Sequence, residues 1–206
     1  MIGIVIPLKR LALAKSRLAT LLDPAARQRL VATLATHVIA TAQQVAARQP
    51  VPVHVWLVSA DPVIAMLARA MNIGYLPDQH EELNAALTAA QMRLQAGGAQ
   101  AIVIIAGDLP FITPTDITML IDALNEVDLA LAPDQNQTGT NALALRLPTT
   151  FPFTFGPDSA TRHLSNATRL GLRTRLINTP TLAFDLDDGE RLQQYYQRAG
   201  CCGVSA

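Results

Sequence analysis

The chain has few of the residues that would indicate disulfides, cysteine metal sites or membrane insertion. Its two cysteines, Cys201 and Cys202, are adjacent, so they can neither cross-link distant segments nor supply a metal site with the usual spacing. No apolar run reaches the roughly 18 to 20 residues of a membrane span. The N-terminal segment 1–7 lacks the charged region and cleavage site of a signal peptide and predicts a strand. We therefore expect a cytoplasmic protein.

Charge is also scarce, and it is balanced. Charged residues make up 16% of the chain, against about a quarter in typical domains, and 16 basic residues offset 16 acidic ones. Nucleic acids and anionic membranes attract a net basic surface, so we expect neither as a partner. Half of the 206 residues are hydrophobic, which allows one sizeable core. We expect a single domain over 1–206 and leave open whether it forms a homodimer.

Strand-like and helix-like segments alternate along the first part of the chain, which predicts an α/β fold with a mostly parallel central sheet flanked by helices. The predicted strands are 2–6, 53–58, 73–76 and 101–106. Three helix starts are predicted where a capping residue precedes a proline, at Asp23-Pro24, Asp61-Pro62 and Thr113-Pro114. A helix end is predicted at Gly97-Gly98.

The pattern changes after about residue 130. Two short strands, 128–132 and 141–147, flank a polar loop, and further short strands and a helix near 159–170 follow. We interpret 1–130 as a nucleotide-binding half. We interpret 131–206 as an acceptor-binding half that shares the sheet and ends in a C-terminal helix.

Cations gather directly after the first predicted strand, at Lys9, Arg10, Lys15 and Arg17. Ligands of open α/β sheets bind at the carboxyl ends of strands, where this segment lies. Four cations there suit a triphosphate, although a solvated basic loop is the simpler alternative. The glycine-rich motifs G-x-x-x-x-G-K-[ST] and G-x-G-x-x-G are absent, so side-chain cations would do much of the neutralising. Lys9, Lys15 and Arg17 are candidate nucleotide-binding residues.

Three acidic residues each follow an apolar run, and we expect them at strand ends. Asp108 follows 101–107, and Asp185 and Asp187 follow 181–184. Because Asp185 and Asp187 are two apart, their carboxylates face one side of an extended segment. Turn or helix-cap roles are the alternative. Carboxylate oxygens suit magnesium, and three carboxylates could serve two ions. Asp108 is thus both a candidate metal ligand and, with Lys15 and Arg17, a candidate catalytic residue.

Two loops in the second half resemble sites for a small ligand, Thr138–Asn141 and Phe155–Ser159. Ser159 is placed to cap the helix that follows, and a helix N-terminus attracts anions. His163, one turn later, could face the same ligand or be a structural histidine. Asn84 is a weaker candidate for contacting the base or ribose of a nucleotide.

No nucleophile with a poised base is apparent in the sequence. An acceptor that is itself a phosphate is already an anion at neutral pH and needs no general base. Catalysis then reduces to positioning and charge neutralisation.

Motifs along nearly the whole chain resemble one family, the CofC-like guanylyltransferases of deazaflavin coenzyme F-420 biosynthesis. They are Ile6–Lys9, Ala14–Leu18, Leu83-Asn84, Gly107–Pro110, Thr140–Leu143, Phe155–Ser159 with His163, and Asp185–Asp187. The resemblance implies a GT-A-like (Rossmann-like) nucleotidyltransferase fold. It implies transfer of GMP from GTP to a small phosphorylated three-carbon acid, with release of pyrophosphate.

The resemblance also implies roles for single residues. Asp108, Asp185 and Asp187 would hold magnesium, and Thr140, Gly156 and Ser159 would contact the acceptor. The family uses phosphoenolpyruvate in many bacteria and 2-phospho-L-lactate in archaea. The segment 156–160 is closer to the bacterial form, so we expect phosphoenolpyruvate, with 2-phospho-L-lactate or 3-phosphoglycerate as alternatives.

One departure from the family is Asp188-Gly189, where Thr-Pro is usual. Asp188 can cap the last helix as threonine would. Two other interpretations stay open: a metal-dependent sugar-transferring enzyme of the same fold, and a non-catalytic nucleotide-binding protein. The dense N-terminal cations argue against the sugar transferase, because a nucleoside diphosphate sugar carries less charge than a triphosphate.

Overall fold

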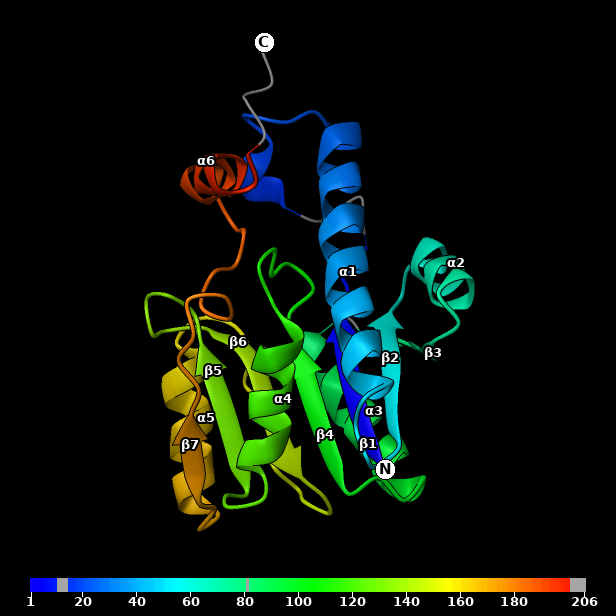
Figure 1. Ribbon diagram of the computed structural model, residues 1–206, viewed down its shortest axis with the longest axis vertical. Coiled ribbons are helices and arrows are strands. Elements are labelled where there is room, and N and C mark those ends of the chain that lie inside the picture. The colour runs from blue at the N-terminus through cyan, green and yellow to red at the C-terminus, as the bar shows by residue number, and fades with distance from the viewer. Residues whose placement is uncertain (11–14, 81, 201–206) are drawn as a thin grey trace.

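A mixed sheet forms the centre of the computed structural model, which describes residues 1–10, 15–80 and 82–200. Within these residues the sheet has seven strands in the order β3-β2-β1-β4-β6-β5-β7 (Figure 1). The strands are β1 (Ile2–Pro7), β2 (Val53–Ser59), β3 (Gly74–Pro77), β4 (Ala101–Ile105), β5 (Leu129–Pro133), β6 (Thr140–Arg146) and β7 (Thr174–Leu176). Strand β6 runs antiparallel to β4 and β5, and the other neighbouring pairs are parallel. The predicted mostly parallel α/β sheet is confirmed.

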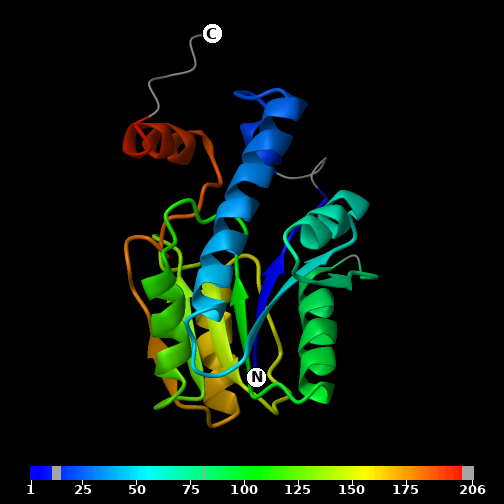
Figure 2. The ribbon, with the colours of Figure 1, turned by 45° about the vertical axis from the view of Figure 1, so that its right-hand side comes forward.

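Helices cover both faces of the sheet (Figures 1 and 2). One core cluster receives buried residues from α1 (Pro24–Ala46), α2 (Pro62–Ala70) and α4 (Pro114–Ala123). The cluster on the opposite face receives them from α3 (Leu83–Ala96) and α5 (Ser159–Arg169). Strands buried on both faces are expected to be apolar throughout, and β4 is buried at every position.

A third apolar cluster lies beyond the carboxyl ends of the parallel strands. It joins the short 3-10 helix η2 (Ser16–Leu18), the N-terminal half of α1 and the last helix, α6 (Gly189–Arg198). These elements stand above the sheet in both ribbon views (Figures 1 and 2). The cluster therefore places the residues after Lys15 and those around Leu186 side by side. None of the described helices is both long and apolar enough to span a bilayer.

The predicted helix boundaries agree with the structure at most positions. Asp23 and Asp61 accept hydrogen bonds from the backbone N–H groups of the helices that they cap. Thr113 and Asp116 form a reciprocal capping box at the start of α4. Gly97 is the C-cap of α3, and Asp188 caps α6 as predicted.

Three local predictions were wrong. Ser159 does not cap α5 but is its first residue, and the N-cap is Asp158, whose φ is 54°. The run 181–184 before Asp185 is not a strand, because its first residues belong to a turn and it pairs with no neighbouring strand among the described residues. Beyond β6, the described residues contain one short strand, β7, where several were expected.

Candidate active site

Lys15 lies between two of the predicted metal ligands. Its Nζ is 2.5 Å from Asp108 Oδ2 and 2.7 Å from Asp187 Oδ1, and its side chain is 8% exposed. Burial alone would lower the pKa of the Lys15 ammonium, but the two carboxylates outweigh this effect, and the net pKa is raised. A positive charge is therefore held at the carboxyl end of β4. Ala14, which precedes Lys15 in the family motif, lies outside the described residues.

The acidic segment before α6 lies against the end of β4. The Leu186 backbone N–H donates to the Asp108 carbonyl oxygen at 3.1 Å. Burial alternates along this segment, with Leu182, Phe184 and Leu186 buried and the residues between them partly exposed. This period of two belongs to an extended chain. Asp185 and Asp187 therefore face the same side, as the sequence predicted, although no strand is formed.

Burial and neighbouring charges shift the pKa values of two carboxylates in this cluster, Asp185 and Asp187. Burial, followed by the negative charges of Asp108 and Asp187, raises the pKa of Asp185 to about 6. Burial would also raise the pKa of Asp187, but Lys15 and then Arg17 and Lys9 bring it below its ordinary value. Three predicted nucleotide-binding cations thus act on one carboxylate, and their charges converge on the predicted metal site.

The chemistry of this donor set fits magnesium. The side chains are hard oxygen donors, and the crowding that raises the pKa of Asp185 would be relieved by a cation. Within the described residues, however, no three His, Cys, Asp or Glu side chains stand close enough together to hold a metal ion. The Lys15 ammonium lies between Asp108 and Asp187 and supplies the cation in this conformation. The metal assignments therefore stay predictions.

Arg17 and Lys9 occupy more open positions than Lys15. Arg17 Nη1 is 3.8 Å from Asp187 Oδ2, and its side chain is 75% exposed. Lys9 is exposed and lies two residues after the end of β1. Both side chains are free of tight packing and can turn toward a charged ligand, whereas Lys15 is held in place by its two carboxylates.

The predicted acceptor residues lie around the N-terminus of α5. The Ala160 N–H donates to the Thr138 carbonyl oxygen at 2.9 Å, which ties α5 to the loop before β6. At the same edge of the sheet, the Ala106 N–H after β4 donates to the Asn141 carbonyl oxygen at 2.8 Å. The start of β6, with Thr140, therefore lies beside the strand that carries Asp108.

His163 is buried beneath this loop, and its hydrogen bonds define its tautomer. The Thr154 N–H donates to Nε2 at 2.9 Å, so Nε2 is an acceptor and carries no proton. The neutral ring then carries its proton on Nδ1 and donates it to Thr140 Oγ1 at 3.1 Å. Burial, with a smaller effect of Arg162, lowers the pKa of His163 to about 4. The Thr140 hydroxyl hydrogen is thus left to donate to another acceptor.

The other predicted acceptor contacts differ in access. Gly156 is exposed and has a φ of 122°, a conformation that side chains rarely adopt. Ser159 is 1% exposed, so its side chain faces the interior of the molecule. Asn84 lies beneath this loop, where its amide donates to the Phe155 carbonyl oxygen at 3.1 Å and accepts from the Phe155 N–H at 2.7 Å. Asn84 therefore holds the acceptor loop. Its predicted role in nucleotide binding stays a prediction.

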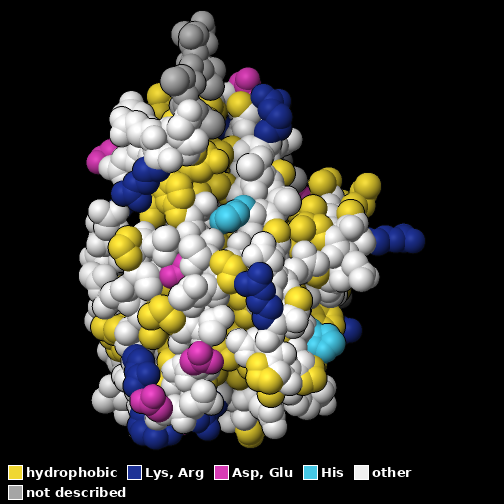
Figure 3. Space-filling model, in the orientation of Figure 1, with side chains coloured by type: hydrophobic (Ala, Val, Ile, Leu, Met, Phe, Trp, Pro, Cys, Tyr) yellow, Lys and Arg dark blue, Asp and Glu magenta, His cyan; other side chains and the backbone are white. Residues whose placement is uncertain are grey.

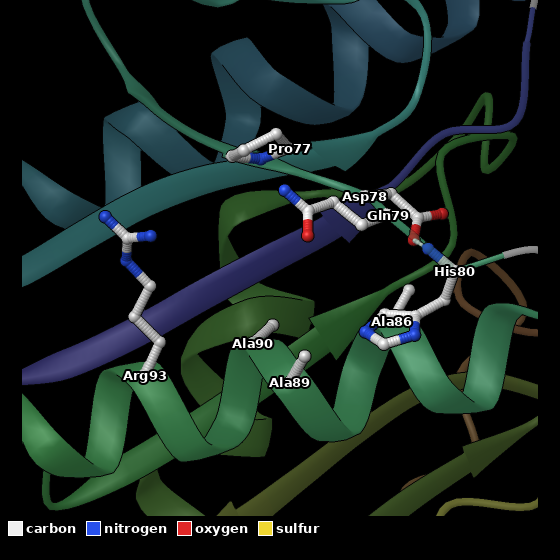
Figure 4. Close-up of a pocket in the computed structure, with 8 residues that line it drawn as sticks. All are labelled: Pro77, Asp78, Gln79, His80, Ala86, Ala89, Ala90 and Arg93. Carbon is white, nitrogen blue, oxygen red and sulfur yellow. Dashed lines mark hydrogen bonds between the residues drawn. The ribbon is translucent and has the colours of Figure 1, made fainter.

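A separate hollow lies beyond the end of β3 and holds none of the predicted site residues. It is lined by residues 77–80 and by Ala86, Ala89, Ala90 and Arg93 of α3 (Figure 4). On the face of the molecule shown in Figure 3, charged side chains of both signs lie close together at the lower left, and much of the remaining surface is uncharged. This is in keeping with the balanced charge of the sequence.

The sequence analysis did not single out Asp116, which is 3% exposed and bonded to Thr113, Thr179 and Thr181. The spacing Thr113-x-x-Asp116 predicts a capping box and could have drawn attention to this carboxylate. The contacts with Thr179 and Thr181 have no signal in the sequence, because more than 60 residues separate them from Asp116.

Comparison with known proteins identifies the family. Residues 2–196 match the family model described as "Guanylyl transferase CofC like". The chain belongs to this family. The phosphoenolpyruvate guanylyltransferase of Chloroflexus aggregans is 63% identical over 195 residues, which cover 95% of this chain and 96% of that protein. The protein of the same name from Chloroflexus aurantiacus is 58% identical and covers 98% of each chain.

Solved structures show the same fold at low sequence identity. A Desulfovibrio desulfuricans protein assigned as a nucleotide-diphospho-sugar transferase has a TM-score of 0.75 at 15% identity, covering 96% of this chain and 87% of that one. A nucleotidyl transferase from Methanothermobacter thermautotrophicus has a TM-score of 0.62 at 14% identity, covering 97% and 99%. The predicted nucleotidyltransferase fold is confirmed, and the protein is an enzyme of the nucleotidyltransferase type.

Proposed function

We propose that this protein transfers GMP from GTP to phosphoenolpyruvate. The products are enolpyruvoyl-2-diphospho-5'-guanosine and pyrophosphate, and the reaction belongs to coenzyme F-420 biosynthesis, which we place in the cytoplasm. The observation that carries the proposal is the similarity over nearly the full length to two proteins named phosphoenolpyruvate guanylyltransferase. These relatives are 63% and 58% identical to this protein, over 95% and 98% of its chain.

The charged cluster supports the nucleotide half of the proposal. Lys15, Arg17 and Lys9 bring positive charge to the end of β1, where ligands of such sheets bind. We propose that these cations bind the triphosphate of GTP and that Asp108, Asp185 and Asp187 hold two magnesium ions. When bound, magnesium neutralises charge on the phosphate oxygens. The protein side chains orient the triphosphate so that its α-phosphorus faces the acceptor.

The acceptor half supplies neutral hydrogen-bond donors. The free Thr140 hydroxyl hydrogen and the loop 156–159 are proposed to bind the phosphate and the carboxylate of the acid. An oxygen of the acceptor phosphate attacks the α-phosphorus, the bond between the α-phosphorus and the bridging oxygen breaks, and pyrophosphate leaves with the electron pair. The attacking oxygen is already anionic, so no general base is needed.

The test is a direct assay of the purified protein with GTP, magnesium and candidate acids. Equal amounts of phosphoenolpyruvate, 2-phospho-L-lactate and 3-phosphoglycerate compete for limiting GTP, and the products are resolved by mass. We expect the phosphoenolpyruvate product to dominate. The acids share a phosphate and a carboxylate and differ only in small groups beside them. Such a difference changes the free energy of transition-state binding by about 1 to 3 kcal/mol, so some 2-phospholactate product is also expected.

The outcomes of this assay separate the parts of the proposal. A product made only from 2-phospholactate overturns the choice of acceptor and leaves guanylyl transfer standing. Absence of any GMP-linked product overturns the proposed function. Ser159→Ala is expected to affect the two acceptors to a similar degree, because the buried Ser159 side chain lies at the end of the loop that is proposed to bind an anionic group shared by both acids.

A further inference from the structure

Asp116 is a buried carboxylate that the proposed chemistry does not use. It is 3% exposed and lies in the first turn of α4. Its Oδ2 accepts from the Thr113 N–H at 2.8 Å and from the Thr113 hydroxyl at 2.7 Å, which completes the capping box of its own helix. A capping box is formed on exposed helices as well. Capping alone therefore does not account for burying this carboxylate.

The rest of the Asp116 carboxylate is turned toward a distant part of the chain. Oδ1 accepts from the Thr179 hydroxyl at 2.6 Å, and the Thr181 hydroxyl lies 2.9 Å from Oδ1 and 2.8 Å from Oδ2. Thr179 Oγ1 in turn accepts from the Leu182 N–H at 3.1 Å. The hydroxyls of Thr179 and Thr181 thus donate to the Asp116 carboxylate, and the Leu182 N–H donates to Thr179. Asp116 therefore fixes the turn at 179–182.

A second side chain holds the same turn from the sheet. The Asn141 amide donates to the Leu182 carbonyl oxygen at 2.8 Å, and the Asn141 side chain is buried. Asp116 and Asn141 therefore hold the segment from two elements, α4 and β6. From Leu182 the chain continues to Asp185 and Asp187, and buried residues alternate with partly exposed ones, as in an extended segment. The orientation of the turn therefore determines the side on which both aspartates lie.

The segment 179–187 has little other support from the backbone. Between described residues, its backbone-to-backbone hydrogen bonds are one within the segment, from the Ala183 N–H to the Thr179 carbonyl oxygen, and one from the Leu186 N–H to the Asp108 carbonyl oxygen. A strand ladder would fix such a segment at every second residue. Here side-chain hydrogen bonds hold the segment in position, and Asp116 accepts the largest share of them.

We propose that Asp116 is a positioning residue for the proposed metal site. It holds the turn at 179–182 so that Asp185 and Asp187 face Asp108, and the affinity of the site for a divalent cation depends on it although Asp116 contacts no ligand itself. This inference rests on the metal-binding part of the proposed function. Groups that hydrogen-bond directly to metal ligands typically change metal affinity by about 10- to 100-fold when removed, and we expect an effect in this range for Asp116, which acts through the backbone of the same segment.

The first test is Mn²⁺ binding to the purified protein without GTP or acceptor, followed by the electron paramagnetic resonance of free Mn²⁺. Thr181→Val removes a cross-contact and leaves the capping box of Thr113 and Asp116 intact, so it preserves α4. We expect it to weaken Mn²⁺ binding about tenfold. Thr179→Val with Thr181→Val and, separately, Asp116→Asn are expected to weaken it further.

A matched control separates positioning from a general loss of stability. Gln91 is 3% exposed on α3, on the opposite face of the sheet, and its amide donates to the Thr149 carbonyl oxygen at 2.7 Å. Gln91→Leu removes a buried hydrogen bond away from the site. We expect its melting temperature to change while the dissociation constant for Mn²⁺ stays within about twofold of the wild type.

The outcomes distinguish this inference from the proposed function. If Thr181→Val and Asp116→Asn lower the melting temperature but bind Mn²⁺ as the wild type does, Asp116 is only structural and the inference is overturned. A wild type that transfers GMP but binds no Mn²⁺ overturns it as well. A wild type that binds Mn²⁺ but transfers no GMP overturns the proposed function, and the variants still decide the role of Asp116.

Discussion

The two ends of the candidate site handle buried polar groups in opposite ways. Around Lys15, charges of both signs are packed together, and they shift the pKa values of Lys15, Asp185 and Asp187. Around His163, both ring nitrogens are hydrogen-bonded to neutral groups, Thr154 and Thr140, and burial keeps the imidazole uncharged. An interior that holds charges needs partners of opposite sign, whereas an interior of neutral groups needs only complete hydrogen bonding.

This difference matches the tasks proposed for the two ends. A cluster that holds three carboxylates beside three cations can exchange the Lys15 ammonium for metal and phosphate charges, because its interactions are electrostatic and adaptable. The neutral end holds its geometry through directional bonds, and this suits the recognition of a small acid by shape. The predictions below test whether the charged end governs nucleotide chemistry and the neutral end governs the acceptor.

The largest effect is expected at the carboxylates. Asp108→Asn and Asp187→Asn should each reduce turnover by about 100-fold or more, roughly 3 kcal/mol of barrier, with the fold intact by circular dichroism. Asp122→Asn, on the exposed side of α4, is the control and should retain wild-type rates. Near wild-type turnover of both site variants at saturating magnesium would remove the basis for a metal site.

The neutral end predicts a dependence of stability on pH. His163 has a pKa of about 4 in the folded protein and about 6.5 when unfolded, so the unfolded chain binds the proton more tightly. Its contribution is complete above about pH 6.5 and is lost as the pH falls toward 4, by at most about 3 kcal/mol. The measurement is the free energy of unfolding against pH for the wild type and for His163→Phe.

The contribution of His163 is isolated by the difference between these two curves. Asp185, whose pKa is raised in the folded protein to about 6, has the opposite sign and remains in both proteins. Phe153→Leu, a change in the same buried cluster without a titrating group, should lower stability equally at all pH values. Parallel curves for the wild type and His163→Phe would mean that His163 does not titrate in this range.

The third prediction compares two cations of the charged end. Lys15→Ala should raise the KM for GTP more than the KM for the acceptor, by roughly 1.5 to 3 kcal/mol, because it removes a buried charge-assisted contact. Arg17→Ala should act in the same direction and more weakly, since an exposed cation contributes up to about 1 kcal/mol. Both constants are measured for both variants. If only the KM for the acceptor changes, the charged end binds the acceptor and not the nucleotide, and our assignment of the two ends is reversed.

A smaller effect than that of Lys15→Ala is expected at Asn84. Its amide makes two hydrogen bonds to Phe155, worth about 1 kcal/mol each. Asn84→Ala should loosen the loop at Gly156, and because only part of this energy is expected to appear in acceptor binding, it should raise the acceptor KM by roughly tenfold or less. Thr88→Ala, one turn later on α3 and exposed, serves as the control. If the KM for GTP rises and the KM for the acceptor does not, Asn84 contacts the nucleotide, as its position in the sequence suggested.

Much of the fold follows from local patterns in the sequence. Short apolar runs between helix-like segments predicted the central strands. Capping residues followed by proline predicted three helix starts, at Asp23-Pro24, Asp61-Pro62 and Thr113-Pro114, because caps and proline act within one helical turn. The nucleotidyltransferase fold and the family followed from ordered motifs, and both are confirmed. The period of two also placed Asp185 and Asp187 on one side of the chain.

The tertiary structure alone decided how these pieces meet. Lys15 forms ion pairs with Asp108 and Asp187, and Asp116 accepts hydrogen bonds from the turn at 179–182; these partners are distant in the chain. The tautomer of His163 is likewise set by hydrogen bonds that only the folded chain brings together. Ser159 carried the residue type of a cap, yet packing made it the first residue of α5. Local sequence determines secondary structure through short-range sterics and hydrogen bonds. Pairing between distant polar groups depends on which elements the shared core brings into contact.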